Sequence, residues 1–296
     1  MESLLSYIVW NPSETFLFGL RYYSLCWLLG LFGSYLIARW LYKDLRIRTE
    51  LFEPLFLYCF VGILIGSRLG HCLFYQPDYF LTSLTHFIEM FLPIRFLADG
   101  SVRFTGYQGL ASHGGTLGLI IAMLVYVKKT RVTAWTVLDI VGISTPICAF
   151  FIRIGNLMNS EIIGKITDVP WAFIFEQVDP MPRHPGQLYE ALAYLLLLFV
   201  GFAVYRKRKD KVGTGFFFGL CLTCIFTFRF FIEFLKEVQE DFEENLMIDM
   251  GQILSLPYII LGIVCIAISW GKTYEIDPKL KIQEKKSKET KQNKKS

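Results

Sequence analysis

The hydrophobic residues of this chain gather in seven long stretches separated by shorter polar segments. A helix rises 1.5 Å per residue, so about 20 apolar residues cross the hydrocarbon layer of a membrane. The stretches predict an all-α fold: a polytopic integral membrane protein with about seven transmembrane helices. The predicted spans cover residues 17–38, 54–75, 109–127, 134–157, 187–205, 214–235 and 251–270.

Lysine and arginine are unequally distributed between the connecting segments. When these segments are assigned to alternate sides of the membrane, one side carries 21 basic residues and the other carries five. Basic loops face the cytoplasm, so we expect the N-terminus outside and the C-terminus in the cytoplasm. Residues 1–271 are predicted to form a single transmembrane catalytic domain, and the Lys-rich tail 272–296 a disordered cytoplasmic segment.

The composition narrows the class of protein further. Hydrophobic residues make up 53% and charged residues 19%. Soluble domains contain fewer hydrophobic and more charged residues than this. The formal net charge is +4, but its basic residues lie in the predicted cytoplasmic loops, so no nucleic-acid partner is expected. Residues 1–18 contain no Lys or Arg and no cleavage site of a signal peptide, so they are expected to be retained.

Cysteine and histidine give no sign of a bound metal. All seven cysteines fall in apolar stretches, where a free thiol behaves as a small hydrophobic group, so no disulfide is expected. The pair Cys221 and Cys224 has redox-like spacing but lacks a second pair. No His or Cys spacing matches a zinc site. We therefore predict neither a metal nor a cofactor.

Four arginines lie inside the predicted spans or at their ends: Arg21, Arg68, Arg153 and Arg229. An arginine at membrane depth is costly unless it pairs with an acid or faces an anion in a polar cavity. The position of Arg21 is explained by a side chain that extends to the membrane surface. For Arg68 this explanation and a functional site stay equally open. Arg153 and Arg229 lie deeper, so each is expected either to pair with an acid or to face an anion.

The densest polar cluster follows Arg153. In a helix Arg153 and Asn156 share a face, and Glu161 lies two turns beyond, so a cation, an amide and a carboxylate can converge. A simple helix end would explain the amides but not the arginine. In the sixth span, Arg229 and Glu233 have the i,i+4 spacing of an ion pair, and pairing for structural reasons is an equal alternative.

Two further segments carry candidate chemistry. His113 stands beside Gly114 and Gly115 at the entrance to the third span, and the glycines are expected to leave the imidazole accessible. A histidine can accept a proton near neutral pH, although a lone one near an apolar helix is more often structural. Residues 183–190 lead into the fifth span and alone would be a capped helix start.

Together these residues resemble the prolipoprotein diacylglyceryl transferase family. The resemblance rests on motifs spread from Tyr23 to Pro257: Gly66-Ser-Arg68-Leu-Gly, His113-Gly-Gly, Arg153-x-Gly-Asn-x-x-Asn-x-Glu-x-x-Gly164, Arg183-His-Pro-Gly-Gln-Leu-Tyr-Glu190, Arg229-x-x-x-Glu233 and Met250-Gly-Gln-Ile-Leu-Ser-Leu-Pro257. The chain departs from the family at Ser24, Ile152 and Leu157, which are apolar or small exchanges. Residues 76–108 match poorly.

The resemblance implies transfer of the diacylglyceryl group of phosphatidylglycerol to the lipobox cysteine of a prolipoprotein, the first step of bacterial lipoprotein maturation. The implied surroundings are the bacterial inner membrane, with the site toward its outer side, and the enzyme is expected to be a monomer. The implied catalytic residues are His113 as general base, Tyr23, Arg229 and Glu233. The implied phosphatidylglycerol-binding residues are Arg68, Arg153, Asn156, Glu161 and Gly164.

Within this resemblance, Glu161 and Glu233 are expected to hold the two deep arginines. The nucleophile is a thiol of the substrate, so the enzyme's own cysteines are expected to be dispensable. Two alternatives stay open from the residues alone: a transporter or flippase for anionic lipids or solutes, and a membrane scaffold. Neither requires His113 beside two glycines, and a scaffold would tolerate its loss.

Overall fold

The computed structural model of the chain describes residues 7–13, 15, 21–97, 100–104, 111–237 and 249–282, except for the side chains of Ser112 and His113. The chain is mostly helical, and six of the described helices are long and apolar enough to cross a membrane. It divides into two compact units, each of which is described by itself. The first contains Met1–Leu41 and Trp135–Ile276, and the second contains Tyr42–Ala134 and Asp277–Ser296.

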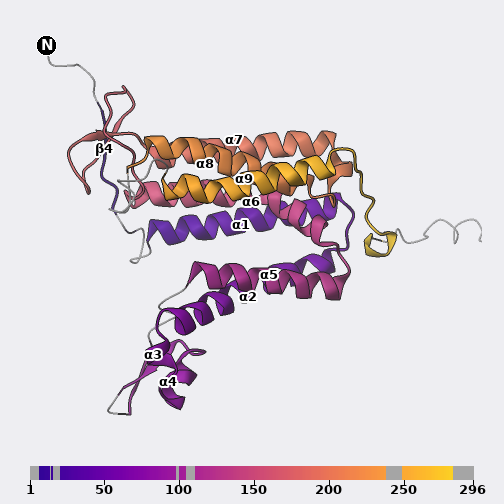
Figure 1. The fold of residues 1–296 in the computed structure, drawn as a ribbon, viewed down its shortest axis with the longest axis horizontal. Coiled ribbons are helices and arrows are strands. Elements are labelled where there is room, and N and C mark those ends of the chain that lie inside the picture. Colours follow the sequence, from indigo (N-terminus) through magenta and orange to yellow (C-terminus); the bar gives the residue numbers. More distant parts are fainter. Residues whose placement is uncertain are drawn as a thin grey trace, which may run out of the picture. The chain divides into compact units, whose positions relative to one another are not determined.

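Five long helices run side by side in the first unit (Figure 1). They are α1 (Tyr22–Asp44), α6 (Ala134–Met158), α7 (Gly186–Lys207), α8 (Phe216–Ile232) and α9 (Met250–Ser269). The part of α1 up to Leu41 belongs to the first unit. Small residues let the backbones approach closely, as in other membrane helices. A Cβ atom at Gly219 of α8 would lie 2.7 Å from the carbonyl oxygen of Gly262 in α9.

A small sheet covers one end of this unit. The sheet has the order β1 (Ile8–Trp10), β4 (Phe173–Phe175) and β5 (Pro182–Arg183), with β1 parallel to β4 and β5 antiparallel to it. Its side chains pack on the end of α6 in a cluster that contains Leu157, Phe173 and Phe175. The indole of Trp10 donates to the carbonyl of Leu157 over 2.9 Å. The sheet therefore fixes the last turn of α6, where the polar cluster of the sequence lies.

The other end of the first unit is held by two buried charges. Asp139 of α6 accepts hydrogen bonds from the backbone N–H groups of Gly213, Gly215 and Phe218 over 2.8, 2.9 and 3.0 Å. Lys211 lies in the short 3-10 helix η3 (Lys209–Lys211), and its buried ammonium donates to the carbonyl groups of Ser269, Trp270 and Lys272. These bonds satisfy backbone groups at a helix start and a helix end, which have no partners within their helices.

The second unit is built on two long helices, α2 (Phe52–Phe74) and α5 (Ser112–Thr130). Between them the chain forms α3 (Pro77–Phe80), α4 (Leu84–Glu89) and a hairpin of β2 (Ile94–Phe96) and β3 (Val102–Phe104). Two 3-10 helices, η2 (Thr49–Leu51) and η6 (Pro278–Leu280), complete the described part of this unit. The tail joins it through a hydrogen bond of 2.9 Å from the N–H of Arg48 to the carbonyl of Leu280.

The helical membrane fold predicted from the sequence is confirmed, with the two small sheets added outside the long helices. Predicted spans 134–157 and 187–205 agree closely with α6 and α7. Predicted span 109–127 corresponds to α5, which begins with Ser-His-Gly-Gly-Thr, ends with Lys128 and Lys129 in its last turn, and is not among the six helices. The count of seven spans and the sidedness stay predictions. The tail 272–296 was predicted to be disordered, and its last part, 283–296, lies outside the described residues.

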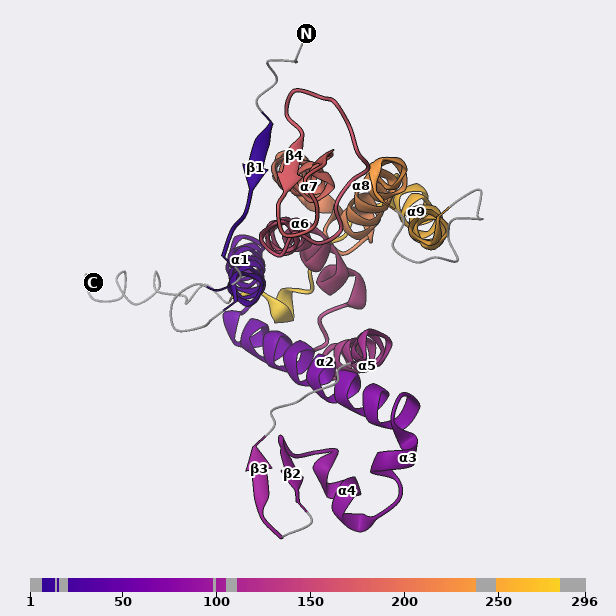
Figure 2. The ribbon, with the colours of Figure 1, turned by 90° about the vertical axis from the view of Figure 1, so that its left-hand side faces the viewer.

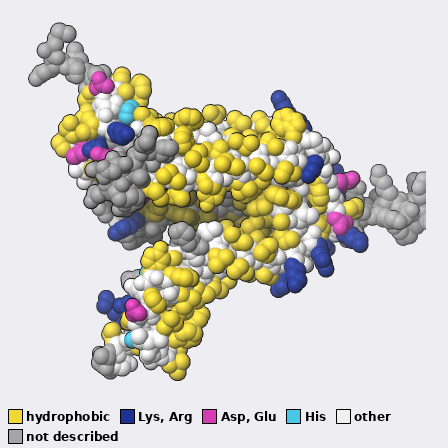
Figure 3. Space-filling view, in the orientation of Figure 1, with side chains coloured by type: hydrophobic (Ala, Val, Ile, Leu, Met, Phe, Trp, Pro, Cys, Tyr) yellow, Lys and Arg dark blue, Asp and Glu magenta, His cyan; other side chains and the backbone are white. Residues whose placement is uncertain are grey.

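The surface agrees with a location in lipid. Figure 3 shows hydrophobic side chains over the long helices of each unit, and Lys and Arg side chains near their ends. Many of the exposed side chains are large and apolar, such as Leu196 and Phe199 of α7, which are each 63% exposed. Apolar surface of this extent on a soluble monomer would be costly, whereas a lipid bilayer covers it.

Candidate active site

A cavity of about 440 Å³ lies among α1, α6, α7 and α8 of the first unit. Most of its wall is apolar and comes from Val141, Ala149, Leu222, Ile225 and Phe226, among others. Six polar side chains also line it: Tyr23, Thr145, Arg153, Asn156, Tyr194 and Arg229. An apolar cavity with a few convergent polar groups is the usual form of a ligand site. This one suits a ligand with an anionic head and an apolar body.

Arg153 lies two turns from the end of α6, and only 11% of its side chain is exposed. Its Nε is 3.1 Å from Oε2 of Glu190 in α7. Its Nη1 donates to Oδ1 of Asn156 over 3.2 Å, as the i,i+3 spacing predicted. These two bonds fix the plane of the guanidinium group at the cavity wall.

Asn156 carries the chain of hydrogen bonds onward to Glu161. Its Nδ2 donates to Oε1 of Glu161 over 2.7 Å. The expectation that Glu161 holds Arg153 is therefore corrected, because the amide of Asn156 lies between them. The helix ends at Met158, which carries Glu161 too far along the loop for a direct ion pair. Gln187 donates to the carbonyl of Glu161 over 2.6 Å and ties this loop to α7.

The loop that follows α6 has a strained backbone where it passes the cavity. Ser160 and Ile162 have φ angles of 52° and 58°, and Ile162 lines the cavity. A β-branched residue in the left-handed region is unfavourable, and such strain is found where the surroundings fix it in place. The loop therefore has one defined path around Glu161.

Glu190 is the centre of the charged cluster and is fully buried. Its Oε2 is 3.1 Å from Nε of Arg153 and 3.1 Å from Nζ of Lys236. Its Oε1 accepts a hydrogen bond of 3.0 Å from the hydroxyl of Tyr194. One carboxylate thus compensates two buried cations, which is necessary where water is excluded.

Sequence reasoning missed the roles of Glu190 and Lys236. Glu190 belongs to the predicted start of the fifth span, where it looked like part of a capped helix. Its position could have indicated a buried ion pair, because a carboxylate at the start of a membrane span needs a cation as partner. Lys236 looked like a loop residue, and nothing local indicates that it is only 3% exposed.

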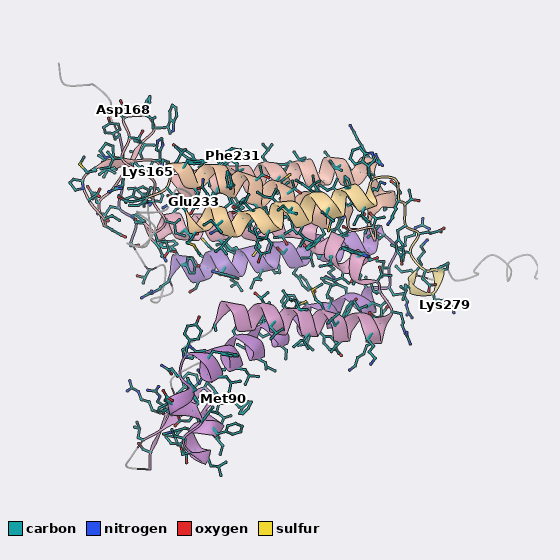
Figure 4. All side chains as sticks on the ribbon, viewed as in Figure 1. Met90, Lys165, Asp168, Phe231, Glu233 and Lys279 are labelled. Carbon is teal, nitrogen blue, oxygen red and sulfur yellow. The ribbon has the colours of Figure 1, made fainter. Side chains whose placement is uncertain are left out.

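The predicted ion pair between Arg229 and Glu233 is not formed. Helix α8 ends at Ile232, and Glu233 begins the 3-10 helix η4 (Glu233–Leu235), whose tighter winding brings residues three apart together. Glu233 accordingly lies 3.0 Å from Nζ of Lys236. Figure 4 labels Glu233 at this end of the unit. Arg229, among the described residues, forms no ion pair, and its side chain lines the cavity.

Tyr23 and Gly164 complete the group of predicted residues in this unit. The ring of Tyr23 packs against α6, where a Cβ atom at Gly155 would lie 2.9 Å from Cδ2 of the ring. Gly164 is buried, and a Cβ atom there would lie 2.5 Å from the carbonyl oxygen of His184. Its N–H also donates to that carbonyl over 2.9 Å. The close backbone packing at this position leaves no room for a side chain and explains why the residue is glycine.

A second set of charges holds the loops beside the cluster. Arg183 pairs with Asp179 and with Glu237, at 2.5 and 2.6 Å, and also donates to the carbonyl of Gly164 over 3.3 Å. The hydrogen bonds from Arg183 hold the pKa of the Asp179 carboxyl below its usual range. Burial lowers the pKa of His184, which favours its neutral form.

Two predicted residues belong to the second unit. Arg68 is buried in α2 and donates to the carbonyl groups of Met90 and Glu89, each over 3.1 Å, and its guanidinium lies over the ring of Phe80. These contacts tie α2 to α4. The side chain of His113 lies outside the described residues, so its predicted role as base stays a prediction.

The glycines beside His113 have a packing role that differs from the expected one. Gly114 faces Gly66 and Gly70 of α2, and a Cβ atom at Gly70 would lie 2.8 Å from Cα of Gly114. Gly115 faces the side chain of Ser67. Small residues at this spacing let α2 and α5 approach closely. Helix contact is therefore one reason for glycine here, and access to the imidazole stays a prediction.

Comparison with known proteins assigns the family. The family profile described as "Prolipoprotein diacylglyceryl transferase" matches residues 14–268. A relative from Bacteroides fragilis, named phosphatidylglycerol--prolipoprotein diacylglyceryl transferase, is 58% identical over 267 residues, which cover 89% of this chain and 95% of the relative. Proteins of the same name from Chloroherpeton thalassium and Porphyromonas gingivalis are 38% and 37% identical, and each comparison covers 88% of this chain and 94% of the relative.

These relatives are named as transferases, and none of the three is named as a transporter. The matched region includes α1, α2 and α5–α8 and most of α9, so both units take part in the similarity. The resemblance recognised in the sequence is thereby confirmed, and the chain belongs to the prolipoprotein diacylglyceryl transferase family.

Proposed function

We propose that the cavity of the first unit binds phosphatidylglycerol and that the chain transfers its diacylglyceryl group to the lipobox cysteine of a prolipoprotein. One observation carries this proposal. Two guanidinium groups, from Arg153 in α6 and Arg229 in α8, line one cavity whose remaining wall is mostly apolar. A phospholipid has the matching form, with one phosphate and two acyl chains.

The two arginines have different parts in this proposal. Arg153 is held by Glu190 and Asn156, so its direction is fixed before the lipid binds. Arg229 has no ion pair among the described residues, and a phosphate is the partner that its charge requires. A guanidinium group can donate two parallel hydrogen bonds to a phosphate. We therefore assign the phosphate to both arginines. Arg229 is the donor that has no ion pair among the described residues.

The proposed reaction is a displacement at carbon. The substrate thiolate attacks the glyceryl carbon that bears the phosphate ester, a carbon–sulfur bond forms, and the carbon–oxygen bond breaks. Glycerol phosphate leaves with the electron pair, and the thiol proton passes to a base. Negative charge grows on the leaving phosphate, and fixed cations in a water-poor site stabilise such charge. The reaction as written needs no cofactor.

The base is assigned to His113 because of the family resemblance. The thiolate is the nucleophile, and a histidine can accept the thiol proton near neutral pH. Tyr23 is assigned to the cavity beside the guanidinium groups, where its hydroxyl is available to orient the headgroup. Glu161 and Glu233 are assigned positioning roles, through Asn156 and Lys236 respectively.

The topology completes the proposal. The basic connections favour a bacterial inner-membrane protein whose N-terminus and active site face outward. Arg153 and Lys236 lie at the end of the bundle that this assignment places outside. The prolipoprotein, with its lipobox cysteine, would approach from that side. The proposed working form is a monomer.

The test uses purified full-length protein, phosphatidylglycerol and a peptide that contains a lipobox cysteine. We expect glycerol phosphate release and a peptide that gains the mass of one diacylglyceryl group. Arg153→Ala should abolish both products, and Arg21→Ala, which removes an arginine outside the cavity, should retain them. Survival of activity in His113→Ala would remove only the base assignment. A wild-type protein that is folded and makes no product would contradict the proposal.

A further inference from the structure

The hairpin of the second unit has one apolar face and one cationic face. Its register pairs Ile94 with Phe104, Arg95 with Arg103, and Phe96 with Val102. Successive side chains of a strand point to opposite faces. The two arginines therefore share one face of the hairpin, and four apolar side chains share the other. Figure 2 shows the two strands side by side, next to α4.

The pairing of Arg95 with Arg103 is unfavourable by itself. Residues directly opposite in an antiparallel pair have Cβ atoms about 4.5–5.5 Å apart, and like charges in this position destabilise the pair. Arg95 lies 5.0 Å from the ring centre of Tyr79, which orients its guanidinium. Neither arginine forms an ion pair with a described residue of the chain. An anion between them would convert a repulsion into two favourable contacts.

Among the described residues, Glu89 is the carboxylate that bonds to this hairpin, and both of its oxygens are already used. Glu89 is 1% exposed, and its Oε1 accepts the N–H of Phe96 over 2.6 Å. Its Oε2 accepts the hydroxyl of Tyr79 over 2.7 Å. Glu89 therefore fixes the hairpin on α4 and pairs with neither Arg95 nor Arg103.

The apolar face indicates what that anion belongs to. Phe104 is 76% exposed and Val102 is 54% exposed. The hairpin is joined through α3 and α4 to the membrane helix α2, whose last residue, Phe74, is 83% exposed. Exposed aromatic and aliphatic side chains next to the end of a membrane span lie in the interfacial layer of the bilayer. At that depth the available anions are the phosphate groups of lipids.

We propose that the β2–β3 hairpin is a headgroup site for anionic phospholipid, in which Arg95 and Arg103 bind the phosphodiester and the opposite face enters the bilayer. The site lies in the second unit and uses none of the residues assigned to the reaction. It belongs to the membrane surface where α2 ends and α5 begins. The proposal rests on the membrane location of the chain and stands independently of the transferase chemistry.

The test is amide hydrogen exchange of full-length protein in lipid nanodiscs. We expect slower exchange of residues 94–97 and 101–104 in discs that contain phosphatidylglycerol than in discs of phosphatidylcholine alone. In Arg103→Gln the fraction of phosphatidylglycerol needed for half of this protection should rise roughly tenfold, because one charge-assisted hydrogen bond is lost. Lys128→Gln with Lys129→Gln, at the other end of α5, is the control and should behave as wild type.

Three outcomes overturn the proposal. The first is equal protection in both kinds of disc, which would indicate apolar contact alone. The second is a normal phosphatidylglycerol dependence in Arg103→Gln. The third is equal protection in phosphatidylcholine discs supplied with inorganic phosphate, which would identify a site for the free ion. Arg103 contacts no described side chain through a hydrogen bond, so its variant should fold, and its melting temperature provides the check.

Discussion

The two ends of the first unit both bury charged residues, but they use them differently. At one end Asp139 and Lys211 are fully engaged with backbone N–H and carbonyl groups at the ends of helices. At the other end, about 21 Å further along α6 by the helical rise, Arg153 and Glu190 bind each other. There both Arg153 and Arg229 line a cavity, which extends from this pair along α6 and α8.

This difference separates a structural role from a chemical one. A buried charge whose partners are all backbone groups holds helices together and has nothing left to offer a ligand. In the cluster at the other end, Glu190 balances two cations, and Arg229 lines the cavity without an ion pair to any described residue. Buried charge alone would not have distinguished the two ends, because both are well shielded from solvent.

The largest effect is expected from Glu190→Ala. The change leaves the guanidinium of Arg153 and the ammonium of Lys236 without their shared buried carboxylate. Breaking a buried ion pair by removing one partner costs about 3–5 kcal/mol of folding free energy. Thermal unfolding in detergent should show a marked fall in the melting temperature. Glu176→Ala, an exposed carboxylate of the same unit, is the control and should melt as wild type.

Arg229→Ala should reduce activity strongly and leave stability almost unchanged. Loss of one group that stabilises transition-state charge costs about 10²–10³-fold in rate, or about 2.7–4 kcal/mol. Folding is spared because this side chain pairs with no carboxylate among the described residues. Release of glycerol phosphate measures the rate, and the exposed Arg206→Ala serves as control. A large fall in melting temperature with normal activity would show that Arg229 is structural.

Asp139→Asn should show the reverse pattern. The side chain loses its charge and one acceptor oxygen, and hydrogen bonds to charged groups are worth about 1.5–3 kcal/mol each. We expect destabilisation of about 2 kcal/mol, with normal activity per folded molecule. Thermal unfolding and the transferase assay on the same preparation measure both quantities. Activity lost from a protein of normal stability would remove the contrast between the two ends.

The smallest effect is expected from Asp179→Asn, and it should depend on pH. Because Arg183 lowers the pKa of Asp179 in the folded chain, its stabilisation is present above the usual carboxyl pKa of 3.8. It is lost as the pH falls through the folded value. The side chain is 27% exposed, so solvent limits the gain at pH 7 to about 1 kcal/mol or less. Melting temperatures of wild type and variant should differ at pH 7, and the difference should shrink as the pH falls below 3.8.

The sequence predicted the parts of this fold that depend on local pattern. Continuous apolar stretches predicted helices such as Ala134–Met158, and the spacing of Arg153 and Asn156 predicted their hydrogen bond. Contacts between distant segments were not predictable in this way. Nothing local shows that Glu190 and Lys236 meet, because they are joined only by the packing of α7 against the turn after α8.

The wrong expectations have physical causes as well. The i,i+4 pair of Arg229 and Glu233 assumed a continuous α-helix, whereas α8 ends between them. The expectation that Glu161 holds Arg153 directly assumed that the helix continued, whereas α6 ends at Met158 and Asn156 lies between the two side chains. A pattern that fits both packing and chemistry is decided only by which neighbours the fold supplies.

The most direct test of the account measures product per folded molecule for Arg229→Ala and Asp139→Asn side by side. Both variants remove one charge from the same unit, one from an arginine that lines the cavity and one from a carboxylate bonded to backbone groups at the other end of α8. The account predicts that Arg229→Ala is folded and makes at most about one hundredth of the wild-type product, while Asp139→Asn melts earlier and transfers the diacylglyceryl group normally. Normal product from folded Arg229→Ala would contradict the claim that this cavity is the site of transfer.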